Sequence, residues 1–186
     1  MLVALTSHPD TPSSAIDRIE VDVLVTGGRP GIAMMALIYR AFGDLGRVRL
    51  PKSAGFGRAD GLWRHSCFEA FVKTECAKGY LEFNFAPSGQ WASYVFDSYR
   101  SGQREAPEIV ALESWTEGGH LALEGDIDLD LTFGEIRSPL KLALSAVIED
   151  IDGGISYWAL AHPPGKPDFH HPDSFVLTLP PPPEPA

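Results

Sequence analysis

Ile19-Glu20-Val21-Asp22-Val23-Leu24-Val25 is the stretch of the chain that indicates its fold most clearly. Successive side chains of an extended strand point to opposite faces. The four β-branched residues at odd-numbered positions would therefore share one face, and the two acidic residues would share the other. One buried face and one hydrated face are typical of a strand in an antiparallel sheet.

Similar runs recur along the rest of the chain, and glycine and proline residues separate them. The 186 residues include 18 Gly and 16 Pro. Turn signals lie where strands should reverse, at residues 87–89, 117–120 and 150–154. About eleven strands are predicted, and they cover residues 2–5, 19–25, 32–41, 67–73, 80–86, 91–97, 109–115, 120–125, 141–149, 155–161 and 174–179.

These strands predict an all-β fold, an antiparallel β-sandwich of the jelly-roll or immunoglobulin-like type. Only residues 32–42 could be fitted to a helical pattern, and their continuous apolar character fits a buried strand as well. We expect one domain over residues 1–179, because a chain of this length favours one domain over two. The proline-rich residues 180–186 cannot donate ladder hydrogen bonds and are predicted to form a disordered tail.

The charge of the chain argues against two classes of partner. The chain has 15 Lys and Arg residues and 25 Asp and Glu residues. The resulting formal net charge of −10 repels phosphate backbones and anionic lipids. No apolar run approaches the roughly 18 residues of a membrane span, so neither nucleic-acid binding nor membrane binding is predicted. Residues 1–5 lack the basic region and the long apolar run of a signal peptide, so a cytoplasmic location is expected. The oligomeric state stays open.

Motifs of the common hydrolases and nucleotide-binding proteins are absent from the sequence. It contains no G-x-S-x-G, no phosphate-binding glycine loop and no H-E-x-x-H. Cys67 and Cys76 lack C-x-x-C spacing, and Cys67 lies in an apolar run that is typical of a small buried residue. The sequence therefore predicts a protein that is not an enzyme.

Two groups of residues have side chains of the kind that bind metals. The histidines of residues 162–171 have no cysteine partners and no standard zinc spacing. Asp126, Asp128 and Asp130 would lie on one side of an extended chain, where a structural calcium ion could bind. Because the segment lacks the glycine and the distal glutamate of an EF-hand, the charged face of a strand is the favoured interpretation. No metal site and no cofactor are predicted.

Glu69 is an unusual residue because its neighbours make both faces of its strand apolar. A charged group there needs either a hydrogen-bond partner or an open cleft, and a buried pair with Arg64 or Arg58 is one interpretation. Glu82 on the next strand would complete the pair of carboxylates typical of a glycosidase. A connection over residues 74–78 would instead set Glu69 opposite Phe83 and send Glu82 to the other face.

Three aromatic residues lie beside loops. Trp63 follows a glycine-rich segment, and Trp91 and Phe169 each lie next to a loop. Flat aromatic rings stack on the C–H faces of sugar rings, while carboxylate, amide and cationic groups form hydrogen bonds with the hydroxyls. These residues are consistent with a cleft for a small polar ligand, although packing at the edge of the core is the alternative for each ring.

Three stretches carry a resemblance to a known group: residues 62–71 (LWRHSCFEAF), 80–89 (YLEFNFAPSG) and 169–179 (FHHPDSFVLTL). Together they resemble the DOMON-like and family 9 carbohydrate-binding module group. Its members share a β-sandwich of about eleven strands, a Trp-x5-Glu step into a central strand, and an aromatic residue before a proline turn and the last strand. The resemblance covers most of the chain after about residue 21.

The resemblance implies a site in which two rings enclose a terminal sugar and a glutamate accepts hydroxyl hydrogen bonds. Trp63 would be one ring, Phe169 the second ring and Glu69 the carboxylate. The arginine position of these modules falls at Asn84, and a polar loop position falls near Lys166. The full predicted ligand site is Trp63, Glu69, Asn84, Trp91, Lys166, Phe169 and His170.

Other relatives in the wider group hold haem between a methionine and a histidine. Met34 and Met35 lie in a very apolar segment, which indicates core packing rather than haem binding. The sequence predicts a non-catalytic domain that binds a small polar ligand between aromatic rings, with a saccharide as the favoured ligand. One alternative is a sugar-processing enzyme that uses Glu69 with a second carboxylate or a histidine. Another is a protein-interaction domain that uses an exposed sheet edge.

Overall fold

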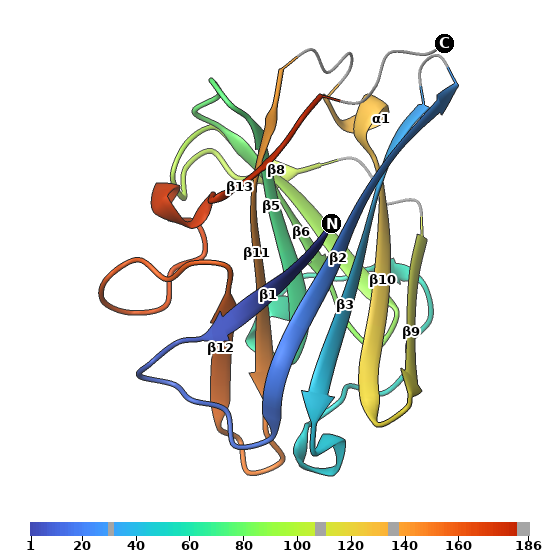
Figure 1. The fold of residues 1–186 in the computed structure, drawn as a ribbon, viewed down its shortest axis with the longest axis vertical. Coiled ribbons are helices and arrows are strands. Elements are labelled where there is room, and N and C mark those ends of the chain that lie inside the picture. Colours follow the sequence, from blue (N-terminus) through green and yellow to red (C-terminus); the bar gives the residue numbers. More distant parts are fainter. Residues whose placement is uncertain (30–31, 107–110, 134–137, 182–186) are drawn as a thin grey trace.

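The structure is a computed structural model that describes residues 1–29, 32–106, 111–133 and 138–181. Thirteen strands among these residues form one curled sheet (Figure 1). They are β1 (Leu2–Ser7), β2 (Ile16–Arg29), β3 (Ile32–Gly43), β4 (Gly57–Arg58), β5 (Cys67–Thr74), β6 (Tyr80–Phe85), β7 (Gln90–Phe96), β8 (Arg104–Glu105), β9 (Ala111–Glu117), β10 (His120–Asp128), β11 (Leu140–Glu149), β12 (Ile155–Ala159) and β13 (Leu177–Leu179).

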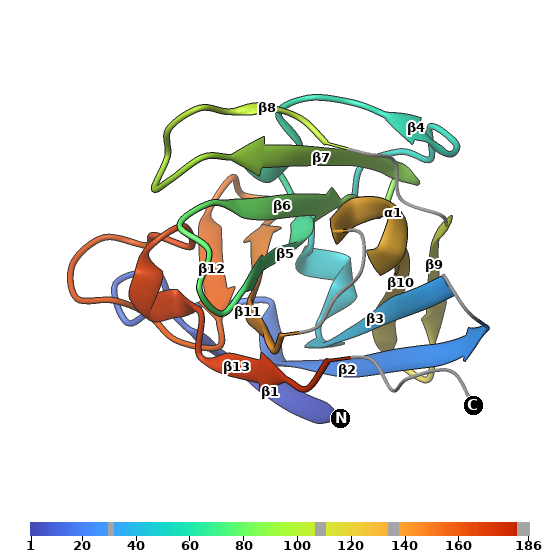
Figure 2. The ribbon, with the colours of Figure 1, turned by 90° about the horizontal axis from the view of Figure 1, so that it is seen from above.

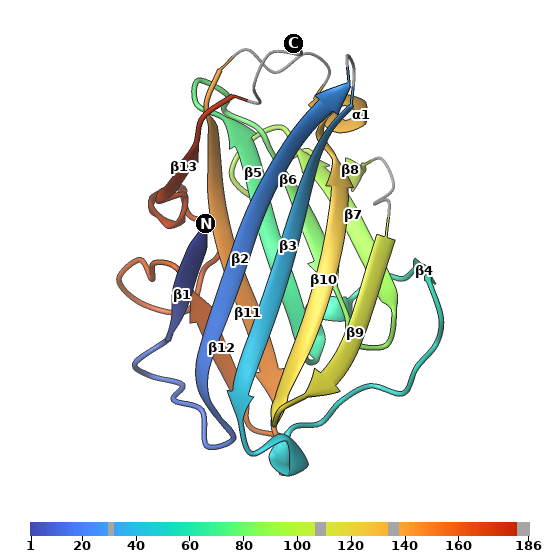
Figure 3. The same cartoon turned by 45° about the vertical axis from the view of Figure 1, so that its right-hand side comes forward.

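The sheet folds back on itself as two arms. One arm has the strand order β1-β2-β3-β10-β9, and the other has the order β12-β11-β5-β6-β7-β4. The pairing of Thr6 in β1 with Ala159 in β12 joins them. Figure 2 shows the two arms as facing layers, and Figure 3 shows the long strands of the first arm side by side. The molecule is therefore a curled sheet with an interior between its arms.

The all-β prediction is confirmed. The named strands of the described residues pair antiparallel with one exception, the parallel pair β4 and β7. The sheet is thus mixed rather than purely antiparallel, and the jelly-roll or immunoglobulin-like connectivity stays a prediction. Residues 32–42, which could also have been a helix, lie in β3.

The alternation in β2 places its side chains as expected. Ile19 and Val21 are completely buried, whereas Leu24 on the opposite face is 44% exposed. From the second arm, Phe68 and Phe85 enter the same core and are also completely buried. Tyr39 in β3 spans the interior, with its ring centroid 5.1 Å from that of Phe68. The core therefore lies between the two arms, and the other face of each arm points away from this core.

Trp91 belongs to this core and not to a ligand site. Its side chain in β7 is 2% exposed and lies in the cluster between the arms. The Arg58 guanidinium lies 4.6 Å from the Trp91 ring centroid, and the Phe56 ring lies 5.9 Å from it. The prediction of Trp91 as a ligand-binding ring is therefore wrong, because its position in the alternation of β7 directs the side chain inward.

Three local predictions also need correction. Strand β10 ends at Asp128, and a short helix, α1 (Leu129–Phe133), follows, so Asp126, Asp128 and Asp130 do not lie along one strand face. The predicted strand 174–179 begins as a 3-10 turn, η3 (Pro172–Ser174), and only β13 is extended. Strands β4 and β8 of two residues each were not predicted. Residues 109–110 and 182–186 lie outside the described residues, so the start of one predicted strand and most of the predicted tail are not described.

Metal and membrane features can be assessed over the described residues. No group of three or more His, Cys, Asp or Glu side chains there is arranged to hold a metal ion. None of the helices in the same ranges combines the length and the apolar composition that crossing a bilayer requires.

Gly125 in β10 provides a test of how closely the arms are packed. A Cβ atom there would lie 2.8 Å from the Phe85 ring of the facing arm. Because Phe85 is completely buried and cannot move freely, we expect Gly125→Ala to lower the free energy of unfolding by about 1–3 kcal/mol. Gly57→Ala is the matched control, since no atom lies within 4 Å of its Cβ position. Urea unfolding measures both, and equal stability of the two variants would contradict the close packing.

Candidate ligand-binding site

A second group of buried aromatic residues covers the outer face of the second arm. Phe71, Tyr80, Phe96, Phe169 and Phe175 belong to this cluster, which is separate from the core between the arms. The segment between β12 and β13, orange to red in Figure 1, supplies two of these rings. Loops thus cover a sheet face that alternation turns away from the core.

The strand register brings two carboxylates to this outer face. Glu69 in β5 pairs with Asn84 in β6, and Phe71 pairs with Glu82. Side chains on one strand repeat their face every second residue, so Glu69 and Glu82 lie on the same face. The prediction that Glu82 points to the other face is wrong. The observed register pairs Glu69 with Asn84 rather than with Phe83, and this slip of one residue reverses the face on which Glu82 lies.

A cavity of about 330 Å³ lies against this face. That volume is near the lower end of the range for small-molecule sites, which is roughly 300–1,000 Å³. Its apolar lining consists of Trp63, Phe96, Val147, Tyr157, Pro167 and Phe169. Its polar lining consists of Glu69, Glu82, Arg100, Gln103 and His170. The cavity therefore has apolar walls and a group of ionisable side chains.

Trp63 and Phe169 are brought to the same cavity although they are far apart in the sequence. Trp63 lies in a 3-10 turn, η2 (Leu62–Arg64), whose first position follows Gly61 in a left-handed conformation with φ of 76°. The indole is 38% exposed and packs edge-to-face with Tyr94, with 6.1 Å between the ring centroids. Phe169 is 9% exposed and packs edge-to-face with Tyr157, with 6.0 Å between the ring centroids. The Trp63 ring is thus accessible, whereas the Phe169 ring is largely held by its neighbours.

Glu69 lies deep in the cavity and is 3% exposed. Its Oε2 accepts a hydrogen bond from Ser145 Oγ at 3.3 Å, and its buried Oε1 has no hydrogen-bond partner among the described residues. Burial, followed by the nearby Glu82 carboxylate, holds the pKa of Glu69 well above its ordinary value. An unpartnered buried acceptor costs about 1–3 kcal/mol. A ligand donor at Oε1 would remove that cost.

Neither predicted arginine pairs with Glu69 in the described residues. Arg58 instead donates to the Ser93 carbonyl at 3.1 Å and to the Ala106 carbonyl at 2.8 Å. Arg64 is exposed, and its side chain lies beside Gly61. The interpretation of Glu69 as one half of a buried structural pair with Arg58 or Arg64 is therefore wrong.

Glu82 has one of its two oxygens fixed by the protein. Oε1 accepts a hydrogen bond from Asn84 Nδ2 at 2.7 Å, and Oε2 lies 3.7 Å from His170 Nε2. Burial raises the pKa of Glu82 to about 6, although the Asn84 hydrogen bond and Arg100 act in the opposite direction. Asn84 is completely buried and does not line the cavity, so its observed role is to hold Glu82.

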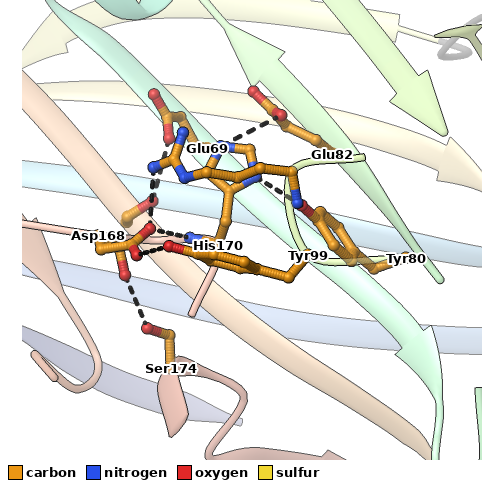
Figure 4. Close-up of polar contacts among 9 residues, drawn as sticks. Glu69, Tyr80, Glu82, Tyr99, Asp168, His170 and Ser174 are labelled. Carbon is orange, nitrogen blue, oxygen red and sulfur yellow. Dashed lines mark hydrogen bonds and ion pairs between the residues drawn. The ribbon is translucent and has the colours of Figure 1, made fainter. Parts of the chain in front are cut away.

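Arg100 enters the cavity from the loop after β7, and it forms hydrogen bonds with Tyr80 and Asp168. Figure 4 shows Tyr80, Tyr99, Asp168 and His170 together at this site. Arg100 has a positive φ of 50°, and its backbone N–H donates to the Tyr80 hydroxyl at 3.2 Å. Its Nη2 donates to Asp168 Oδ1 at 2.8 Å, and the Tyr99 hydroxyl donates to Asp168 Oδ2 at 2.6 Å. The Tyr80 oxygen also lies 2.7 Å from His170 Nδ1. These contacts tie the loop to the segment between β12 and β13.

His170 is a neutral imidazole at pH 7. Burial, followed by Arg100, lowers its pKa to about 4. Because the Tyr80 oxygen already accepts the Arg100 N–H, we assign the Tyr80 proton to the bond with Nδ1. The ring proton then lies on Nε2, which faces Glu82. At 3.7 Å this contact is longer than a hydrogen bond, so it leaves Glu82 Oε2 open to a ligand.

Comparison with known proteins identifies a solved structure that has the same fold. No family model and no curated protein matches the chain. A protein of Bacteroides uniformis ATCC 8492, described as a proposed carbohydrate-binding protein, superposes with a TM-score of 0.69 and 16% identity over 94% of this chain and 84% of that one. The two proteins share a fold. A family 9 carbohydrate-binding module from Caldicellulosiruptor kristjanssonii, solved with cellotriose, gives a TM-score of 0.49 and 7% identity over 83% of this chain and 70% of that one. Membership of the DOMON-like group stays a prediction.

The predicted site residues fall into two groups. Trp63, Glu69, Phe169 and His170 line the shared cavity, whereas Asn84, Trp91 and Lys166 are not among its lining residues. Lys166 precedes Pro167, which does line the cavity, so the predicted loop contributes to the site through Pro167.

The lining residues Arg100, Gln103 and Tyr157 were not predicted, and Glu82 was expected on the other face of the sheet. Arg100 lies in the loop directly after a predicted strand, which is the one signal that could have marked it. The arginine expected near Asn84 from the resemblance is therefore absent there, and a guanidinium enters the cavity from a different segment.

Proposed function

We propose that this protein binds a saccharide in the cavity beside Trp63 and leaves it chemically unchanged. The observation that carries the proposal is that two aromatic rings, Trp63 and Phe169, line the same cavity as Glu69. Aromatic rings pack against the C–H groups of a sugar ring, and a buried carboxyl oxygen accepts from its hydroxyls. The accessible face of Trp63 is the natural position for the sugar.

The polar groups of the cavity suit a ligand rich in hydroxyl groups. A hydroxyl can donate to Glu69 Oε1, which lacks a partner among the described residues, and can accept from Arg100 or Gln103. Arg100 is already oriented by Asp168, so little side-chain entropy is lost on binding. Support at a general level comes from the fold that the chain shares with the proposed carbohydrate-binding protein of Bacteroides uniformis.

Isothermal titration calorimetry with a panel of monosaccharides and disaccharides tests this function. We expect saturable heat with at least one sugar, and the sugar should be recovered unchanged after incubation. Sorbitol, which has the hydroxyls without the ring, is the control ligand and should bind more weakly than the cyclic sugar. Absence of heat with every saccharide of the panel would overturn the proposal.

A second candidate function is a sugar-processing enzyme, and one observation favours it. Glu69 and Glu82 line one cavity, and their raised pKa values are of the kind that a general acid needs. An assay with aryl glycosides separates the two functions. Release of the aryl group by the wild type, together with its loss in Glu82→Gln, would support the enzyme and contradict simple binding.

A further inference from the structure

The polar end of the cavity contains more acceptors than donors. Glu69 Oε1 is buried without a hydrogen-bond partner, and Glu82 Oε2 has His170 Nε2 only at 3.7 Å. The other oxygen of each carboxyl is already used, by Ser145 and by Asn84 respectively. Two carboxyl oxygens from neighbouring strands therefore remain for a ligand, and each can accept from a donor when its carboxyl is ionised.

The positive charge near these oxygens is already committed. Arg100 is the one Lys or Arg side chain that the described residues contribute to the lining, and it donates to Asp168 Oδ1 at 2.8 Å. Asp168 also accepts from Tyr99, which keeps its carboxylate beside the guanidinium. His170 accepts from Tyr80 and is neutral at pH 7. The single guanidinium of Arg100 is thus shared among three carboxyls, Asp168, Glu69 and Glu82, so Glu69 and Glu82 have no countercharge of their own.

The pKa values of both acids are raised. Burial is the main cause for each, the Glu82 carboxylate raises the pKa of Glu69 further, and Arg100 acts in the opposite direction on both. The two groups therefore keep protons at pH values at which an exposed glutamate is ionised. A cation placed between them would favour their ionised forms, and a proton would leave as the cation binds. The cavity is thus better suited to a cationic group than to a neutral one.

An alkylammonium group matches the site in two further ways. It carries three N–H donors and no acceptor, which complements two unfilled carboxyl oxygens. Aromatic rings also attract cations through their faces, and Trp63 and Tyr157 belong to the same lining.

We propose that the saccharide recognised by this cavity carries a protonated amino group, which lies between Glu69 Oε1 and Glu82 Oε2. The inference rests on the proposed saccharide binding and specifies the class of sugar. The hydroxyl-bearing sugar ring then lies against Trp63 and Phe169, and its amino group lies at the two carboxyls. A neutral sugar or an N-acetylated sugar would leave the two carboxyls without a countercharge.

Calorimetric titration of the full chain at pH 7 with glucosamine, glucose and N-acetylglucosamine tests the inference. We expect glucosamine to bind at least about tenfold more tightly than glucose, because charge-assisted hydrogen bonds are about twice as strong as neutral ones. N-acetylglucosamine should lose this advantage. Glu82→Gln should reduce the ratio of glucosamine to glucose affinity to about threefold or less, whereas Glu105→Gln on the exposed strand β8 should keep it.

A second measurement does not depend on any variant. Titration of the wild type in two buffers with different ionisation enthalpies gives the number of protons exchanged on binding. We expect net proton release with glucosamine and no release with glucose.

The outcomes separate this inference from the proposed function. Equal affinity for glucose and glucosamine, or no proton release with glucosamine, would overturn the inference and leave saccharide binding intact. No heat with any of the three sugars would overturn the proposed function as well. Cyclohexylamine has the ammonium group without hydroxyls, and affinity equal to that of glucosamine would count against a saccharide ligand.

Discussion

Trp63→Ala should weaken saccharide binding about 30-fold or more, with little change in the stability of the protein. Tryptophans at the centre of a binding site typically contribute about 2 kcal/mol or more, and each 1.4 kcal/mol corresponds to a factor of about ten in the dissociation constant. Because the Trp63 side chain is 38% exposed and touches Tyr94 only at its edge, removing it leaves the core intact. Calorimetric titration, with urea unfolding of the same samples, measures both effects.

Trp115→Ala is the matched control for this variant. Trp115 lies in β9 at the far edge of the first arm, is 36% exposed, and does not line the cavity. We expect it to bind the sugar like the wild type. Phe169→Ala is a poorer test, because that ring is 9% exposed and its loss would also disturb the buried cluster around it. Unchanged affinity in Trp63→Ala would exclude the indole as a ligand contact.

Glu82→Gln should stabilise the folded protein by about 2 kcal/mol at alkaline pH and by almost nothing at acidic pH. Burial raises the pKa of Glu82 from 4.5 to about 6, and each pKa unit corresponds to about 1.4 kcal/mol. A glutamine keeps the oxygen that accepts from Asn84 and never has to ionise in a buried position. Urea unfolding of both proteins from about pH 4 to about pH 8 measures this difference.

The sign of this effect follows from where the proton is held more tightly. The folded state holds the Glu82 proton more tightly than the unfolded state, so this group favours folding below pH 4.5 and that contribution is lost as the pH rises through about 6. His170 acts in the opposite sense, because its pKa is lowered to about 4 and its contribution is lost as the pH falls. The comparison of Glu82→Gln with the wild type removes the His170 contribution from the result.

Glu105→Gln, an exposed glutamate in β8, is the control and should follow the wild type across the pH range. The additional coupling of Glu82 to Glu69 acts in the same direction, so the stabilisation should not fall below the effect of Glu82 alone. A difference between Glu82→Gln and the wild type that stays constant with pH would show that Glu82 does not carry a raised pKa.

The strands themselves were largely predictable because their signals are local. Alternation over β2 and the glycine-containing turns between strands depend only on neighbouring residues. The two-residue strands β4 and β8 carry no such signal, since alternation cannot be recognised over two positions. The helix α1 was missed for a similar reason, as its five residues are too few for a helical period.

The ligand site was predictable only where one residue type carries its own signal. Glu69 is a carboxyl within an apolar strand, and Trp63 is a large ring beside a glycine-rich segment, so both could be selected from the sequence. Trp91 has the same local signal as Trp63, yet it lies in the core. Composition therefore identified ring candidates but could not distinguish a ring that faces the ligand from a ring that faces the other arm.

By itself, the sequence determined that this protein is built from β-strands and that Glu69 needs a partner or a cleft, because both follow from side-chain alternation and from the cost of burying a charge. The tertiary structure decided which groups meet Glu69. Strand register, which depends on the whole pair of strands and reverses with a slip of one residue, brought Glu82 to its side. Loop packing brought in Arg100, through a contact with Asp168 that lies 68 residues further along the chain. Such contacts between distant segments leave no local pattern in the sequence.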